Sequence, residues 1–293
     1  MAKKKTAKTA FFHYTIPFVL IFGAFKLYPM LYGFILSFLD RNSIKKLSST
    51  TFVGLKNYIN VLSSQTFWSS FLHTLIFSFV YTLFIMVLGT VLGILFNKKF
   101  KGRTVVRTMF YLPYVTNMIA VGIVFKYLLN PTRGPVNAIF RLFGTSGPKW
   151  LSSPTMALPT AAMIAAYVAL AFNIITVLAA LQDIPQDYFE VARLEGATYW
   201  QTIKHIILPV LVPTLFTLLT INVINSFKSY TTIVGLTGGG PGKASRTLSY
   251  QIYEDAFSFS KFSIASAEGV ISMITVIVVH RILTIVRRRR ESA

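Results

Sequence analysis

The sequence predicts an all-α membrane protein with six transmembrane helices and both termini in the cytoplasm. Three observations lead to this fold class. The chain of 293 residues is 54% hydrophobic and only 13% charged, whereas soluble proteins carry about 25% charged residues. Six apolar segments are long enough to cross a bilayer as a helix, which takes about 20 residues. Lysine and arginine gather in short clusters directly beside these segments.

The six spans are expected as helices, because backbone inside lipid must satisfy its own hydrogen bonds. The first segment follows several lysines, as a signal peptide would, but it is long and lacks a small-residue cleavage pattern, so we expect it to be retained. The predicted spans are residues 14–38, 71–96, 108–129, 156–181, 208–227 and 263–285.

The third span is the least regular of the six. It contains Pro113, Asn117 and Lys126. A proline inside a helix removes a hydrogen bond and bends it, and a lysine in a span extends its ammonium group toward an interface. We therefore expect a kinked or partly sheltered helix here.

The distribution of positive charge predicts the orientation. With the N-terminus inside, the inner segments carry sixteen Lys and Arg, and the much longer outer loops carry eleven. The clusters in 97–107 and 287–290 lie directly against spans. The expected organisation is a basic cytoplasmic N-terminus (1–13), a first helix with an outer loop (14–70), a core domain with five transmembrane helices (71–287), and a basic tail (288–293).

The first outer loop contains apolar residues at helical spacing. Phe52, Leu55, Tyr58, Ile59 and Leu62 recur as on one face of a helix. Such a segment suits either a helix at the membrane surface or a structural connector, and we favour the connector.

Composition excludes several classes of chemistry. The chain has no cysteine, which rules out disulfides, thiol nucleophiles and cysteine-based zinc sites. The net charge of +20 is explained by the clusters at span ends rather than by nucleic-acid binding. Four histidines lack metal-ligand spacing and are assigned to packing: His13, His73, His205 and His280.

The stretch GGGPGKAS invites comparison with a phosphate-binding loop. That motif, GxxxxGK[ST], needs glycine where Thr237 stands and serine or threonine where Ala244 stands. We therefore expect no nucleotide site, no catalytic residue, no metal and no cofactor in this chain.

The connection between the fourth and fifth spans holds four of the nine acids in the chain: Asp183, Asp187, Glu190 and Glu195. The segment reads as two short helices around a glycine. Pro185 suits a first helical turn, and Gly196 suits a helix stop with positive φ. Thr198 with Gln201 forms a capping-box pattern that starts the second helix.

The same segment mixes small and large apolar side chains, which suits a helix that fits a groove on a partner. The alternative is a helix pressed on lipid headgroups, and acids facing an anionic leaflet argue against it. The residues alone leave both interpretations open.

A resemblance favours the partner. The run Glu190-Val-Ala-x-x-Glu-Gly-Ala, then five residues, then Ile203-x-x-Ile-x-Leu-Pro209, resembles the EAA motif of ABC-importer permeases, EAAxxDGAxxxxxFxxIxLP. Val191, Glu195 and Ile203 replace the motif's Ala, Asp and Phe. The resemblance implies a type I importer permease fold in the cell membrane, with 186–209 as the coupling loop seated in a cytoplasmic ATPase. It implies these coupling residues: Glu190, Ala192, Glu195, Gly196 and Ala197.

A second resemblance narrows the subfamily. The run GLTGGGPGKASRTLSYQIYEDAF after the fifth span is similar to the LTGGGP loop of sugar-importer permeases of the maltose and glycerol-3-phosphate type, and LLNPTRGPVN and AFN also resemble that group. The resemblance implies import of a carbohydrate by a non-enzymatic chain. It implies four partners: a second permease chain, an ATPase dimer that binds ATP and Mg, an extracytoplasmic binding protein, and the carbohydrate. We favour a heterodimer of two different permease chains over a homodimer, and the sequence leaves both open.

Three alternatives remain. One is an importer of glycerol phosphate. Another is an ATP-independent carrier or channel in which Glu268 and Lys126 line an ion path. The third is a membrane scaffold without transport.

Sugar contacts need neutral donors and acceptors beside aromatic faces. Asn173 is the first choice, because AFN resembles the family's substrate-facing region. Glu268 lies about two turns inside the sixth span, where it either serves function or only extends to the interface. The other pathway candidates are Tyr167, Phe172, Asn222, Asn225, Ser226 and Phe227, and each alone is more often a packing residue.

Overall fold

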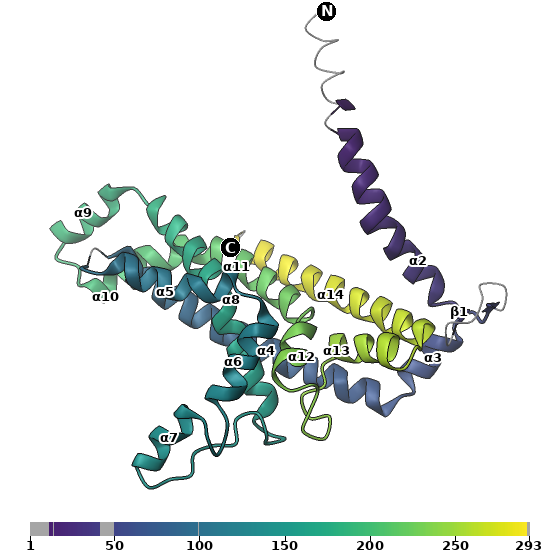
Figure 1. Ribbon diagram of the computed structural model, residues 1–293. Coiled ribbons are helices and arrows are strands. Elements are labelled where there is room, and N and C mark those ends of the chain that lie inside the picture. The colour runs from purple at the N-terminus through teal and green to yellow at the C-terminus, as the bar shows by residue number, and fades with distance from the viewer. Residues whose placement is uncertain (1–11, 14, 42–49, 99, 292–293) are drawn as a thin grey trace, which may run out of the picture. The chain divides into compact units, whose positions relative to one another are not determined.

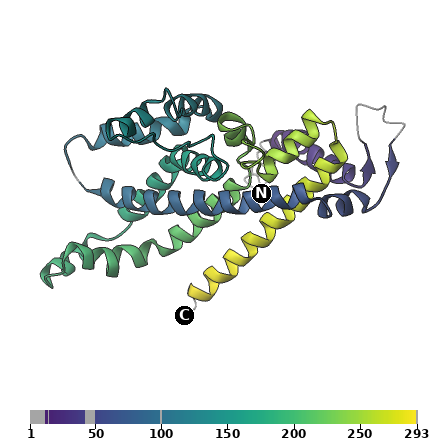
Figure 2. The same cartoon turned by 90° about the horizontal axis from the view of Figure 1, so that it is seen from below.

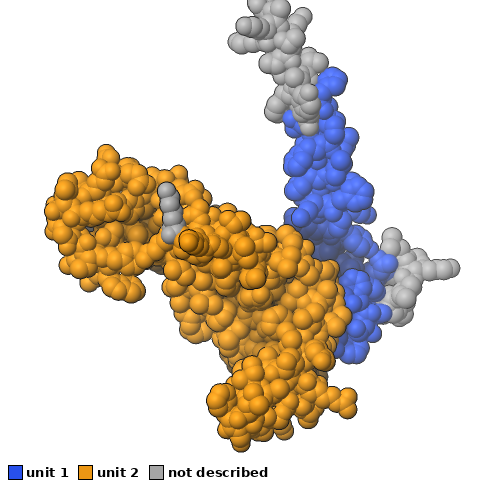
Figure 3. All heavy atoms as spheres, turned by 60° about the vertical axis from the view of Figure 1, so that its left-hand side comes forward, with its two compact units in different colours: residues 1–65, 252–271 blue, residues 66–251, 272–293 orange. Residues whose placement is uncertain are grey.

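The computed structural model describes residues 12–13, 15–41, 50–98 and 100–291 (Figure 1). The basic N-terminus was predicted as 1–13 and the basic tail as 288–293. Residues 1–11 of the first and 292–293 of the second lie outside the described residues. The chain forms two compact units, one of residues 1–65 with 252–271 and one of residues 66–251 with 272–293 (Figure 3).

The first unit contains the first span and a small hairpin. The span is helical over Thr15–Leu36, with a π-turn, η1 (Gly23–Leu27), before α2 (Tyr28–Leu36). Two antiparallel strands follow, β1 (Leu39–Asp40) and β2 (Thr51–Phe52). The sequence predicted no strand here, because two-residue strands carry no periodic pattern.

Helix α3 (Lys56–Leu62) confirms a helix in the first outer loop, although Phe52 belongs to β2 instead. Asn57 on this helix is buried, and its amide donates to the carbonyls of Ser37 and Leu39, both at 2.9 Å. This amide ties the helix to the end of the first span. The unit also contains η4 (Glu254–Ser258).

The second unit is centred on three long helices, α4 (Gln65–Asn97), α8 (Ala157–Gln182) and α11 (Leu208–Ser226), and α4 runs without interruption (Figure 2). Glycines one turn apart let α4 and α8 approach closely. A Cβ at Gly89 would lie 2.7 Å from the Cβ of Asn173, and one at Gly93 would lie 2.6 Å from the Cγ1 of Val177. Neither contact leaves room for a side chain.

The predicted third span is a broken helix. Helices α5 (Arg103–Val115) and α6 (Met118–Leu128) meet at an angle of 111°. Pro113 lies inside α5, and the side chain of Asn117 caps α6 by accepting from the N–H of Ile119. The expected kink is confirmed, but it is a sharp break. Lys126 is exposed in the last turn of α6.

Within the described ranges, five helices are long and apolar enough to span a membrane, and the bent pair is the sixth candidate. The five are Thr15–Leu36, Gln65–Asn97, Ala157–Gln182, Tyr199–Ser226 and Phe262–Arg289. The last of these spans belongs to α14 (Phe262–Glu291). Shorter helices are α7 (Pro135–Leu142), α12 (Tyr230–Leu236) and α13 (Leu248–Tyr253).

The fifth span differs from its predicted boundary of 208, because the helix already begins at Tyr199. Helix α10 (Tyr199–Thr202) continues through a π-turn, η3 (Ile203–Ile207), into α11. The ring of Pro209 would clash with the carbonyl of His205 in a regular helix, and the widened turn before it relieves that clash.

Candidate functional site

Helix α9 (Gln186–Leu194) follows Pro185 and ends at the glycine that the sequence singled out. Gly196 has φ +75°. Its N–H donates to the carbonyl of Arg193 at 3.1 Å, and the N–H of Ala197 donates to that of Ala192 at 2.8 Å. This pair of bonds is the Schellman motif, which satisfies the last carbonyls of a helix and fixes the direction of the exit.

The second helix starts with the predicted capping box. Gln201 accepts from the N–H of Thr198 at 2.7 Å, and the hydroxyl of Thr198 accepts from the N–H of Gln201 at 3.4 Å. The stop of α9 and the start of α10 are therefore both held by local hydrogen bonds, which makes the loop a defined helix–turn–helix.

The apolar side of this loop faces outward. We call Tyr188, Val191, Leu194 and Trp200 the loop face; their exposed fractions are 57%, 52%, 88% and 76%. Ala192 points inward and is 7% exposed. A helix that packs only on its own chain turns its large apolar residues inward, so an outward apolar face indicates a surface for a partner.

The other predicted coupling residues surround this face. Glu190, Glu195 and Gly196 are exposed, and Ala197 is half-buried. The carboxylates are thus available to a partner, while Ala192 and Ala197 allow the loop to lie close to the ends of the spans.

Two predicted pathway residues contact each other. The amide of Asn222 on α11 donates to Asn173 on α8 at 2.8 Å, and the amide of Asn173 donates back at 3.3 Å. Both side chains are 1% exposed. In this structure they are a helix–helix amide pair rather than an open contact surface.

A double-mutant cycle separates these two roles. Asn222→Leu should leave the Asn173 amide buried without its partner, at a cost of about 1–3 kcal/mol. The double variant Asn173→Leu, Asn222→Leu should melt at a higher temperature than the summed effects of the two single substitutions predict. The coupling free energy between the two amides should be about 0.6–1.7 kcal/mol. Thermal melting of the purified protein measures this. Additive melting shifts combined with loss of transport would indicate that each amide acts on substrate separately.

A groove of about 460 Å³ lies between α4, α11 and α14. Phe227 lines it, and Ser226 lies directly behind it, donating to Ser78 at 2.7 Å. Sequence reasoning missed Ser78, Thr82 and Met86, which line the groove from α4. Small polar residues spaced by four in an otherwise apolar span were the signal that could have found the first two.

Thr82 is the most informative of these. Thr82 lines the groove, but its hydroxyl oxygen is buried and has no hydrogen-bond partner within the described part of the chain. A buried hydroxyl without a partner is costly, so rotation of this side chain into the groove would let it bond a ligand's hydroxyl group.

The remaining candidates are dispersed. Tyr167 packs edge-on against Phe125 with ring centroids 6.0 Å apart. Phe172 is 38% exposed and Asn225 is exposed. Glu268, in the first unit, is 1% exposed and has an interaction partner. Since a carboxylate that extends to the interface would be exposed, this burial disfavours the snorkelling alternative.

The glycine-rich segment after α12 is a compact turn. Tyr250 donates to the carbonyl of Gly238 at 3.0 Å, and Ser245 donates to that of Gly240 at 2.6 Å. The next helix, α13, starts only at Leu248. A phosphate-binding loop opens directly into a helix. This segment differs from such a loop in its geometry as well as in its sequence.

Long apolar helices joined by a helical loop with an outward apolar face are typical of a membrane subunit that docks a partner. Comparison with known proteins gives the family. Residues 85–292 match the family described as "Binding-protein-dependent transport system inner membrane component". The chain belongs to this family and is a multi-pass membrane protein, the permease component of an ABC transport system.

Individual relatives cover most of both chains. The trehalose/maltose transport system permease protein MalF of Thermococcus litoralis is 32% identical over 77% of this chain and 76% of its own. The sn-glycerol-3-phosphate transport system permease protein UgpA of Agrobacterium fabrum is 34% identical over 78% of each chain. A bacterial ABC transporter involved in the import of the acidic polysaccharide alginate is 25% identical, with a TM-score of 0.84 over 99% of each chain.

Proposed function

We propose that this chain is the permease subunit of an ATP-driven importer that moves a carbohydrate across the cell membrane. A separate ATPase dimer that binds ATP and Mg docks on the loop 186–209. A second, different permease chain completes the pore, and an extracytoplasmic binding protein delivers the sugar. The outward loop face, carried by two helices that meet at the Schellman motif and the capping box, is the observation that carries the ATPase role.

The mechanism follows from the rigidity of the loop. Glu190 and Glu195 present carboxylates beside the loop face, and the turn at Gly196 passes directly into the helix Tyr199–Ser226. Closure of the ATPases would move this loop as a body and shift the pore from inward-facing to outward-facing. Hydrolysis belongs to the partner, and this chain supplies the moving helices.

The chemistry of the groove favours a neutral substrate. Its lining from α4, α11 and α14 is almost wholly apolar, with Ser78 and Thr82 as its polar residues, and it contains no charged side chain among the described residues. Sugars are recognised by hydroxyl and amide groups beside aromatic faces, here Thr82 and Phe227, whereas a phosphate dianion calls for arginine or lysine. A sugar is therefore the first proposal and sn-glycerol 3-phosphate the second, supported by the relative UgpA.

Uptake by the reconstituted importer tests this function. Proteoliposomes containing both permease chains, the ATPase and the binding protein should accumulate labelled maltose or trehalose only with ATP, and an ionophore that collapses ion gradients should have no effect. Labelled sn-glycerol 3-phosphate serves as the second substrate. Uptake that continues without ATP and stops with the ionophore would establish the ion-coupled carrier instead.

A further inference from the structure

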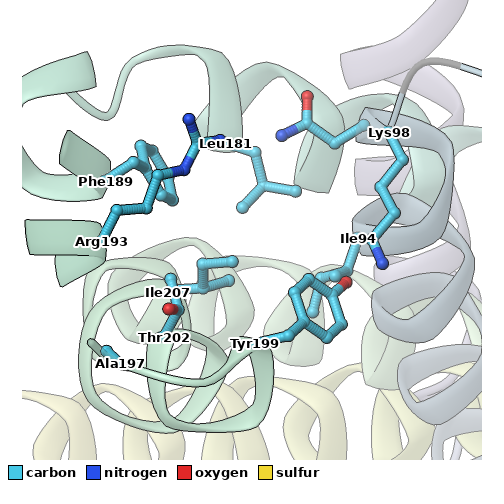
Figure 4. A pocket seen from close by; sticks show the side chains of 10 residues that line it. Ile94, Lys98, Leu181, Phe189, Arg193, Ala197, Tyr199, Thr202 and Ile207 are labelled. Carbon is cyan, nitrogen blue, oxygen red and sulfur yellow. The ribbon is translucent and has the colours of Figure 1, made fainter.

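A pocket of about 420 Å³ lies behind the loop, among the ends of α4 and α8 and helices α9 and α10 (Figure 4). Its apolar wall is formed by Ile94, Leu181, Phe189 and Ile207. The volume falls in the range of roughly 300–1,000 Å³ found for small-molecule sites. It lies apart from the groove that we assign to the substrate.

Two cations line this pocket from opposite sides. Arg193 comes from α9, and Lys98 follows the end of α4 (Figure 4). The Lys98 ammonium nitrogen lies 3.5 Å from the centroid of the Tyr199 ring, and Tyr199 also lines the pocket. The structure gives neither cation an ion pair with a described residue.

The acids of the loop do not offset this charge inside the pocket. Asp183, Asp187, Glu190 and Glu195 are exposed, and none of them lines it. The polar groups that do line it besides the two cations and Tyr199 are the neutral side chains of Asn97 and Thr202. A cavity with two cations, neutral polar groups and an apolar wall selects an anion attached to a less polar group.

We propose that this pocket binds a phosphate ester. Arginine matches phosphate oxygens with a planar fork of donors, and lysine binds them as a point charge. The apolar wall suits the glycerol and first carbons of a phospholipid, and the basic segment 97–107 beside the end of α4 suits an anionic leaflet. A free phosphate compound shares the same chemistry.

A bound phosphate would connect the loop to α4. Arg193 belongs to the helix that carries most of the loop face, whereas Lys98 directly follows α4, a span of the packed core. An anion held between them stabilises one position of α9 relative to α4. The loop's freedom to move therefore depends on the occupancy of this pocket.

Titration of the purified full chain tests the proposal without an ATPase or any transport. In a neutral detergent, dioctanoyl-phosphatidylglycerol and inorganic phosphate are titrated separately, and binding is measured by native mass spectrometry and thermal shift. Binding of the lipid alone assigns a phospholipid, and binding of inorganic phosphate with equal or higher affinity assigns a soluble compound. Both results support the phosphate site.

Substitutions locate the binding. Arg193→Gln and Lys98→Gln should each weaken it by about tenfold or more, since each removes a charge-assisted hydrogen bond. Lys204→Gln is the matched control, because Lys204 is an exposed cation that does not line the pocket. Unchanged binding by the double variant, or an equal loss in the control, would overturn the proposal. The titration contains no ATPase, so its outcome does not depend on whether the loop docks one. Failure of the phosphate site would therefore leave the proposed ATPase docking untouched, and the reverse also holds.

Discussion

Gly122→Ala should destabilise the protein strongly, at or above the upper end of the roughly 1–3 kcal/mol that overpacking costs. A Cβ at Gly122 would lie 2.7 Å from the carbonyl carbon of Gly235, 2.8 Å from its oxygen and 2.9 Å from its Cα. All three atoms are backbone, so no side-chain rotation relieves the clash. The helices α6 and α12 would have to separate.

Thermal melting in detergent measures this change, and two other glycines calibrate it. Gly235→Ala should cost less, because its nearest contact is the Cα of Ile119 at 3.2 Å. Gly269→Ala, with nothing within 4 Å, should be neutral or raise the melting temperature, because alanine favours a helix by about 1 kcal/mol. If Gly122→Ala melts like the wild type, the close contact between α6 and α12 is not present in solution.

Leu194→Asp should abolish coupling without unfolding the chain. Leu194 is 88% exposed, so its replacement removes little internal packing. At the centre of an interface the loss should reach about 2 kcal/mol or more, which is about 30-fold in ATPase affinity. The introduced carboxylate would also be desolvated against the partner. ATP-driven uptake should fall to background.

Co-purification of the ATPase and melting of the isolated chain measure docking and folding separately. Phe143→Asp is a suitable control, because Phe143 is 81% exposed and lies outside the loop. It should leave ATPase binding unchanged. An ATPase that co-purifies equally well with Leu194→Asp would show that the loop face is not the docking surface.

The sequence predicted the features that depend on neighbouring residues. Gly196 and the pair Thr198 and Gln201 act through hydrogen bonds that join residues at most five positions apart in the chain. The residue types alone therefore predict the turn and the helix start. The break at Asn117 was predicted as a kink for the same reason, although the angle depends on how α6 packs against α12.

Features that depend on distant residues could not be predicted in this way. Asn173 and Asn222 were both chosen as pathway residues, but their pairing joins positions 49 apart in the chain. The contact of Gly122 with Gly235 likewise needs the arrangement of two helices. The pocket with Lys98 and Arg193 combines two basic residues that the sequence assigned only to orientation.

The helix from Tyr199 to Ser226 continues through the π-turn η3 and past Pro213, so it can act as a lever. Its 28 residues correspond to about 42 Å at 1.5 Å per residue. Turned by about 6° as a rigid rod of that length, it would displace its far end by about 4 Å. Ser226 lies at that end, directly behind the groove. A small rotation of this helix at the loop would therefore move Ser226, beside the groove that we assign to the substrate, by several ångströms. No hinge loop lies between the two ends, in the described residues 199–226, to absorb the movement.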